Sequence, residues 1–168
     1  MVPLPGGGGK GGAAAVPQSA ARTGVPVIDV TLGDTSSTQM FIHLSADSAP
    51  AGRVTFIIHN SSTDMDHELV GFLTKTMADA YKITGFEGDP NRIDEDTAGP
   101  VVLDTGAALK PGTTKMMTVT MPAGHAALVC NLPGHYKAGM HVDFWAYPRG
   151  STPVTATLGD TSATQMFP

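Results

Sequence analysis

The sequence lacks most of what zinc modules, nucleic-acid-binding proteins and membrane proteins depend on. Its 168 residues include a single cysteine, so the chain can form no internal disulfide, no cluster held by four thiolates and no multi-cysteine zinc site. Charged residues make up only 15%, the net charge is −5 and the 10 basic residues are scattered, which argues against a nucleic-acid partner. No apolar run reaches the roughly 18 residues of a membrane span, so no transmembrane segment is predicted.

What the sequence does contain favours strands joined by turns. It has 20 glycines, 13 prolines and 41% hydrophobic residues, a composition typical of an all-β domain. Short apolar runs recur between turn signals, which predicts a Greek-key β-sandwich or barrel of seven to eight strands in one domain. The turn between the second and third runs is placed at residues 48–52, and a short helix is predicted over residues 74–81, with Thr76 as its N-cap. The predicted strands are residues 27–32, 40–45, 53–60, 67–73, 100–103, 115–121, 125–130 and 140–147.

Both ends of the chain differ from this central domain, placed at residues 25–148. Residues 1–24 are rich in Gly, Ala and Pro and are expected to form a flexible or extended arm, or else to be a processing remnant; no secretory signal is visible in them. In the tail, residues 149–168, the segment 31–41 recurs as residues 157–167 with one difference. Two explanations stay open. Either a second domain begins there, or the copy pairs with a neighbouring subunit, giving a homo-oligomer through residues 151–168 that can extend head-to-tail into a filament.

An acidic stretch at residues 87–96 interrupts the strand pattern. It contains five acidic residues and one arginine, Arg92, and its glycines and prolines predict an excursion over the surface. A solvated loop is the simplest interpretation. A partner-docking face and a weak calcium site are the alternatives, although no EF-hand spacing supports calcium.

The most informative stretch surrounds the single cysteine. Four residues separate Cys130 from His135 and another four separate His135 from Met140, with Pro133, Gly134 and Gly139 to bend the loop. Thiolate and thioether are soft donors and imidazole is borderline, a set that suits copper cycling between Cu(I) and Cu(II). The alternative is a buried cysteine that acts as a small hydrophobe. A copper site would still require a second imidazole.

These residues resemble the cupredoxins, the small type 1 (blue) copper proteins. The resemblance rests on an isolated histidine at a strand start followed by Cys-x-x-Pro-Gly-His-x-x-x-Gly-Met, and its spacing is most similar to rusticyanin, sulfocyanin and auracyanin. It implies that His67, Cys130 and His135 hold one copper ion in a trigonal plane with Met140 as the axial ligand. His67 also stands apart from the other histidines, which lie in or beside predicted strands, because it follows a loop. Those other histidines are His43, His59, His125 and His141.

The resemblance also implies surroundings and a function for the site. Glu68 and Asn131, which follow His67 and Cys130, are expected to lie around the ligands; Glu68 departs from the family, where Asn or Ser is common. His135 is expected at the surface, within an apolar rim for docking a redox partner. The expected activity is one-electron transfer outside the cytoplasm, in the periplasm, at the cell surface or in the medium, without enzymatic chemistry. The rim residues are Leu132, Pro133, Ala138 and Gly139.

Three other functions compete with electron transfer. A copper enzyme would add further copper centres, yet the chain has no His-x-His pair and no second cysteine. A copper carrier would repeat methionine at short intervals, whereas the nine methionines are dispersed. A structural or assembly subunit remains open because of the recurring segment in the tail.

Overall fold

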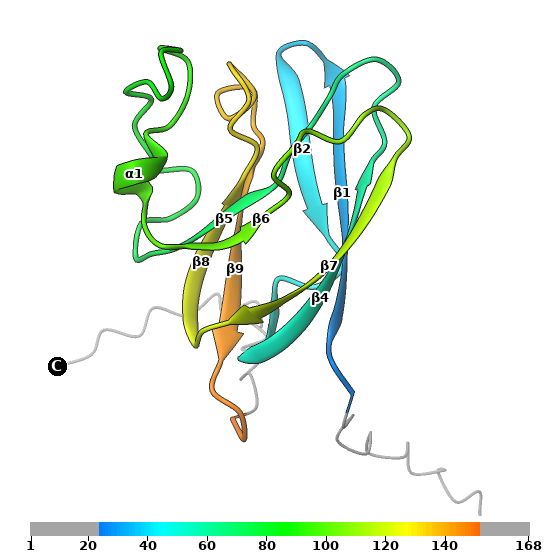
Figure 1. The fold of residues 1–168 in the computed structure, drawn as a ribbon, viewed down its shortest axis with the longest axis vertical. Coiled ribbons are helices and arrows are strands. Elements are labelled where there is room, and N and C mark those ends of the chain that lie inside the picture. The colour runs from blue at the N-terminus through cyan, green and yellow to red at the C-terminus, as the bar shows by residue number, and fades with distance from the viewer. Residues whose placement is uncertain (1–23, 152–168) are drawn as a thin grey trace, which may run out of the picture.

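Alternating apolar side chains build the first of two sheets in the computed structural model, which describes residues 24–151 (Figure 1). Along β1 (Val27–Ser36) and β4 (Gly52–Asn60), every second residue is buried between the sheets. The strand order is β2-β1-β4-β7, in which β1 and β4 run parallel and the other neighbours run antiparallel. The two remaining strands of this sheet are β2 (Gln39–Leu44) and β7 (Thr114–Met121).

The second sheet carries the loop of candidate metal ligands, which joins β8 to β9. Its order is β3-β9-β8-β5-β6, with β3 and β9 parallel and the other neighbours antiparallel. The aromatic core joins the two sheets, because the rings of Phe56 and Phe144 meet edge to face at 5.5 Å between centroids. The strands are β3 (Ser48–Pro50), β5 (Val70–Leu73), β6 (Val101–Asp104), β8 (Gly124–Val129) and β9 (His141–Tyr147).

The predicted all-β sandwich is confirmed, with nine strands among the described residues instead of seven to eight. The additional strand is β3, which falls where a turn was predicted. It pairs with β9 through the register Ser48 to Trp145, so its strand character comes from a partner about a hundred residues away. The turn signals in residues 48–52 describe only the step from β3 to β4.

The predicted helix over residues 74–81 is wrong. Three of its backbone N–H groups donate to side chains. Thr76 N donates to Thr74 Oγ1 at 3.0 Å, and Ala78 N donates to Asp143 Oδ1 at 2.7 Å. Tyr81 N likewise donates to the Tyr136 hydroxyl at 2.9 Å. These side chains replace the i to i−4 bonds that a helix requires. The one helix among residues 24–151 is instead α1 (Glu95–Ala98), capped by Asp94 within the acidic stretch.

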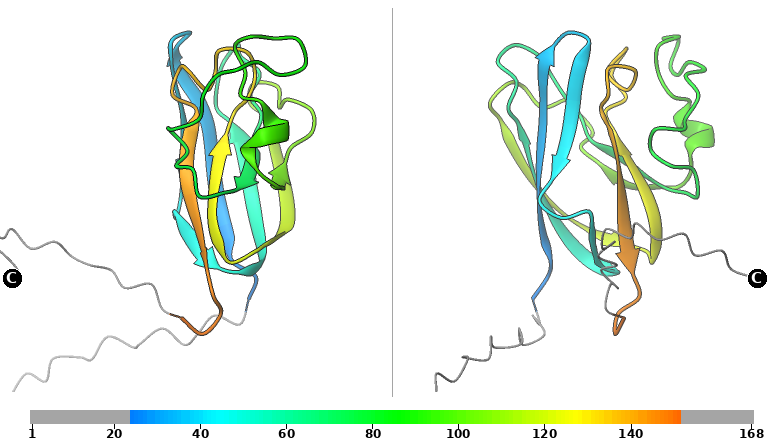
Figure 2. Two further views of the ribbon diagram at one scale, coloured as in Figure 1. Left: turned by 90° about the vertical axis from the view of Figure 1, so that its left-hand side faces the viewer. Right: turned by 180° about the vertical axis from the view of Figure 1, so that it is seen from behind.

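The segment between β5 and β6, which contains the acidic stretch, covers the outer face of the second sheet (Figure 2). A second apolar cluster forms there, in which Ile93 and Ala98 pack against outward-facing residues such as Phe72 and Val129. The segment is therefore packed on the sheet and is more than a solvated loop. The loop between β8 and β9 lies next to this segment, where Gly134 N donates to Asn91 O at 3.1 Å.

The predicted arm, residues 1–24, and the predicted tail, residues 149–168, lie almost wholly outside the described residues. Their predicted character and the domain boundaries at 25 and 148 remain predictions. Within residues 24–151, no helix has the length and apolar character needed to cross a bilayer.

Candidate metal centre

The loop between β8 and β9 returns on itself so that its two ends lie side by side. Cys130 N donates to Met140 O at 3.1 Å, and Met140 N donates to His135 O at 3.1 Å. Gly139 has φ +112°, and a Cβ atom there would lie 2.7 Å from Met40 O. A residue with a side chain would therefore meet both backbone strain and a clash at this position. The loop can pass this close to Met40 of β2 only because residue 139 is glycine.

His67 lies at the same end of the sandwich as this loop, three residues before the start of β5. Its N–H donates to Leu109 O at 3.1 Å, and its carbonyl accepts from Leu109 N at 2.7 Å. Its side chain is completely buried. The two-bond bridge fixes the residue although it precedes β5, which starts at Val70.

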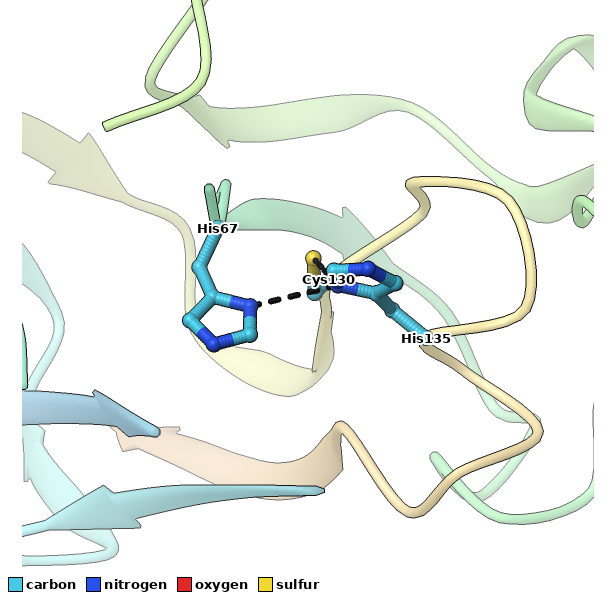
Figure 3. Close-up of side chains that lie close together, drawn as sticks. All are labelled: His67, Cys130 and His135. Carbon is cyan, nitrogen blue, oxygen red and sulfur yellow. Dashed lines mark hydrogen bonds between the residues drawn. The ribbon is translucent and has the colours of Figure 1, made fainter. Parts of the chain in front are cut away.

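Two imidazole nitrogens and the thiol sulfur converge between these segments (Figure 3). His67 Nδ1 lies 3.2 Å from His135 Nδ1, which lies 3.4 Å from Cys130 Sγ. The ligand atoms of all three residues fall within 4.8 Å of one another, and this is the one such group of His, Cys, Asp or Glu found within residues 24–151. Met140, completely buried, adjoins Cys130 through its backbone. The structure thus gathers in one place the four residues selected as metal ligands.

Burial sets the protonation of the three groups. It lowers the pKa of His67, although the Asp34 carboxylate opposes this, and it lowers the pKa of His135, with the neighbouring His67 adding to the effect. Burial also raises the pKa of the Cys130 thiol to about 12. Both imidazoles are therefore neutral at pH 7, with lone pairs free to bind a metal ion. The thiol holds its proton until a cation displaces it.

The cysteine sulfur also receives a backbone hydrogen bond. Glu68 N donates to Cys130 Sγ at 3.4 Å, and Asn131 N donates to Glu68 Oε1 at 3.1 Å. The residue after each ligand thus holds the other ligand's segment. Burial raises the pKa of Glu68, and the nearby positive charge of Arg92 opposes this rise. The unusual residue at position 68 therefore supplies the sulfur contact through its main chain and the bridging contact through its side chain.

Asn131 links the ligand loop to the acidic stretch. Completely buried, its side chain accepts from Ile93 N at 2.7 Å and donates to Ile93 O at 3.0 Å and to Glu95 Oε1 at 2.8 Å. Arg92 Nε donates to Asn131 O at 2.7 Å, and the same guanidinium pairs with Glu87 at 2.8 Å. The acidic stretch is accordingly a brace for the segment that carries Cys130.

Asp34 lies behind His67, on the side away from the sulfur. Its Oδ1 is 3.5 Å from His67 Nε2, without the alignment of a hydrogen bond, and neither buried atom has another hydrogen-bond partner within residues 24–151. A histidine that binds a metal through Nδ1 carries its proton on Nε2 and commonly donates it to a carboxylate. This orphaned pair therefore fits a histidine whose Nδ1 is engaged by a metal ion.

The donor set fits copper in particular. Donors at bond lengths of roughly 2.0–2.3 Å around one ion can lie about 3.5 Å apart, so the two separations in this site fit a single metal ion. The donor types, not the spacing, select among metals. Two imidazoles, one thiolate and one thioether form the set typical of type 1 copper. Zinc would not normally select a thioether.

The residues predicted to form a docking rim lie on the same loop as His135. His135 is half-buried, as are Leu132, Ala138 and Gly139, while Pro133 is exposed. Gly134, with φ +83°, has open space around it and turns the loop toward His135. The four predicted rim residues thus belong to one accessible loop.

Sequence reasoning missed two contributors to the site. Asp34 gave only an indirect signal, since it lies in the segment that recurs in the tail. Arg92 was visible as the single base of an acidic run, but its contact with Asn131 depends on a fold that brings together positions 39 residues apart.

Comparison with known proteins places this fold. No protein-family model and no curated protein matches the sequence. Among solved structures, reduced auracyanin from Roseiflexus castenholzii has a TM-score of 0.52 at 21% identity, covering 74% of this chain and 98% of that one. Auracyanin B has a TM-score of 0.50 at 19% identity, with 77% and 94% covered. A histidine-to-methionine variant of rusticyanin has a TM-score of 0.50 at 17% identity, with 73% and 79% covered. Residues 24–151 therefore have the cupredoxin fold, the fold of the auracyanins and rusticyanin.

Proposed function

We propose that this protein is a type 1 copper electron-transfer protein. His67, Cys130 and His135 would hold the copper ion, and Met140 would add a weaker thioether ligand. The observation that carries the proposal is the convergence of two Nδ1 atoms and the cysteine sulfur in a buried site. Bound copper would supply a one-electron couple between Cu(I) and Cu(II).

The protein's own contribution is to keep the ligands still. The bridges between Glu68 and Asn131, and between His67 and Leu109, tie the ligand segments to each other and to the sandwich. Ligands that move little between oxidation states favour fast electron transfer. Half-buried His135 provides the route to the surface, and its rim suits a transient partner with an interface below about 1,200 Å².

Similar structures and the sequence favour this function over enzymatic chemistry. The auracyanin from Roseiflexus castenholzii was crystallised in a form reduced by sodium dithionite, so that protein takes up electrons. The present chain has one cysteine and no His-x-His pair, which a copper enzyme built on this fold would use for further centres. We also propose that it acts outside the cytoplasm, as the resemblance of its ligand motif to the cupredoxins implies.

Copper titration followed by visible absorption tests the proposal. Wild-type protein should bind one equivalent of copper and develop an intense thiolate-to-copper absorption band, and the bound copper should be reversibly reduced in voltammetry. Cys130→Ser is the matched control, because it exchanges only the sulfur for oxygen. A wild-type protein that binds no copper, or a serine variant that develops the same band, would refute the site assignment.

A further inference from the structure

The segment that recurs in the tail has a defined place in the fold. Residues 31–41 form the second half of β1, the turn to β2 and the first residues of β2. Their copy at residues 157–167 is identical except that Ala163 stands for Ser37. Ser37 is exposed at the turn between the two strands. The copy therefore keeps every buried residue of the original segment.

The original segment forms one wall of the metal centre. Asp34 faces His67 Nε2, and Met40 N donates to Ala138 O at 2.8 Å. Leu32 is completely buried in the core between the sheets. The copy carries the same groups as Leu158, Asp160 and Met166. It could make the same contacts wherever the place of β1 and β2 is open.

The likeness extends upstream of the identical residues. At the spacing of the repeat, Val154 and Ala156 correspond to Ile28 and Val30, the other two buried apolar residues of β1. The copy thus repeats the inward-facing pattern of the whole strand with smaller side chains. The correspondence ends at Phe167, because Pro168 stands where β2 has the buried residue Ile42.

The end of β9, which precedes the copy in the sequence, lies at the same end of the sandwich as the start of β1. Tyr147, the last residue of β9, accepts at its carbonyl from Ala51 N at 2.7 Å, just before β4. The entry of β1 lies along the same strand, where Thr55 N donates to Pro26 O at 2.8 Å and Val27 pairs with Thr55. Figures 1 and 2 show the end of β9 and the start of β1 at one end of the molecule.

The distance between these two points is short. From Ala51 to Thr55 is four residues along β4, or about 13 Å at the rise of a strand. Residues 148–153, which join β9 to the copy, can span roughly 20 Å when extended. The copy can therefore enter beside β4 in the direction of β1, which runs parallel to β4.

We propose that residues 153–167 are a second occupant of the place held by β1 and the first residues of β2, in the same molecule. The segment 27–41 is the favoured occupant, because Ile28 and Val30 fill the core better than Val154 and Ala156 and because the strand β2 has Ile42 where the copy is followed by Pro168. When β1 and β2 leave, the C-terminal copy restores Leu158 to the core and Asp160 to the side of His67.

Disabling each copy in the full chain tests this exchange. Leu32→Asp puts a charge in the core and removes the first occupant, so the single variant should keep a cooperative urea transition, at a lower midpoint, through the C-terminal copy. Leu158→Asp alone should unfold like wild type. The double variant, Leu32→Asp with Leu158→Asp, should show no cooperative transition by circular dichroism. Copper is not needed for this measurement, so its outcome is independent of the proposed electron transfer.

A matched control lies outside both copies. Leu103 is buried in the same core but belongs to β6, so Leu103→Asp should abolish the transition whether or not position 158 is changed. The proposal is overturned if Leu32→Asp alone unfolds the chain, or if the double variant is as stable as that single variant. The exchange should also be independent of protein concentration. A rescued variant that is dimeric at every concentration tested would assign the copy to a neighbouring molecule and overturn exchange within one chain.

Discussion

Raising the pH should destabilise the metal-free protein through one buried group, the Cys130 thiol. Its side chain is completely buried, and burial raises its pKa from the ordinary 9.0 to about 12. Between these two values the unfolded chain releases the cysteine proton while the folded protein retains it. The unfolded state then binds fewer protons, so the free energy of unfolding falls as pH rises.

The size of this effect follows from the two pKa values. Below about pH 9 the thiol costs nothing, because it is protonated in both states. Above it, each pH unit removes about 1.4 kcal/mol, so the loss is about 2 kcal/mol at pH 10.5 and reaches about 4 kcal/mol near pH 12. Cys130 is deeply buried, and solvent therefore screens little of this loss.

Urea denaturation of metal-free wild type and Cys130→Ser measures the effect. Each protein is unfolded at pH 8 and at pH 10.5, and the change in its unfolding free energy is taken between the two. Lysines and tyrosines contribute to both proteins alike, so the difference between the two changes isolates the thiol. Wild type should lose about 2 kcal/mol more than the serine variant. Equal losses would show that the cysteine titrates normally and is not in a dry site.

Further substitutions test the remaining parts of the centre. Met140→Leu should retain copper and raise the reduction potential measured by voltammetry, because loss of a weak axial donor favours Cu(I); an unchanged or lower potential would contradict an axial role. Gly139→Ala should cost about 1–3 kcal/mol in urea denaturation, since it places a methyl group against Met40 O at positive φ; Gly134→Ala, at positive φ in open space, is its control. Arg92→Ala should cost about 1.5–3 kcal/mol by removing the charged donor to Asn131 O, and unaltered stability would exclude the brace.

The sequence predicts well whatever is encoded locally. The β8–β9 loop could be recognised because its three candidate ligands lie within eleven residues. Most strands could be predicted from short apolar runs between turn signals. What it could not predict depends on remote partners. The strand β3 exists because of β9, and the N–H groups of Ala78 and Tyr81 donate to Asp143 and Tyr136. A helix propensity summed along the chain contains neither contact.

The position of the cysteine is determined by groups that do not touch a bound ion. Glu68 and Asn131 each hold the segment of the other, and the buried amide of Asn131 is held in turn by Ile93 and Glu95. None of these bonds involves an atom that would bind the metal, so they would resist a shift in donor positions when a bound ion changed its charge. A solvated loop at residues 87–96 could not provide that resistance. The acidic stretch would therefore help to hold the cysteine in place during the electron transfer that we propose.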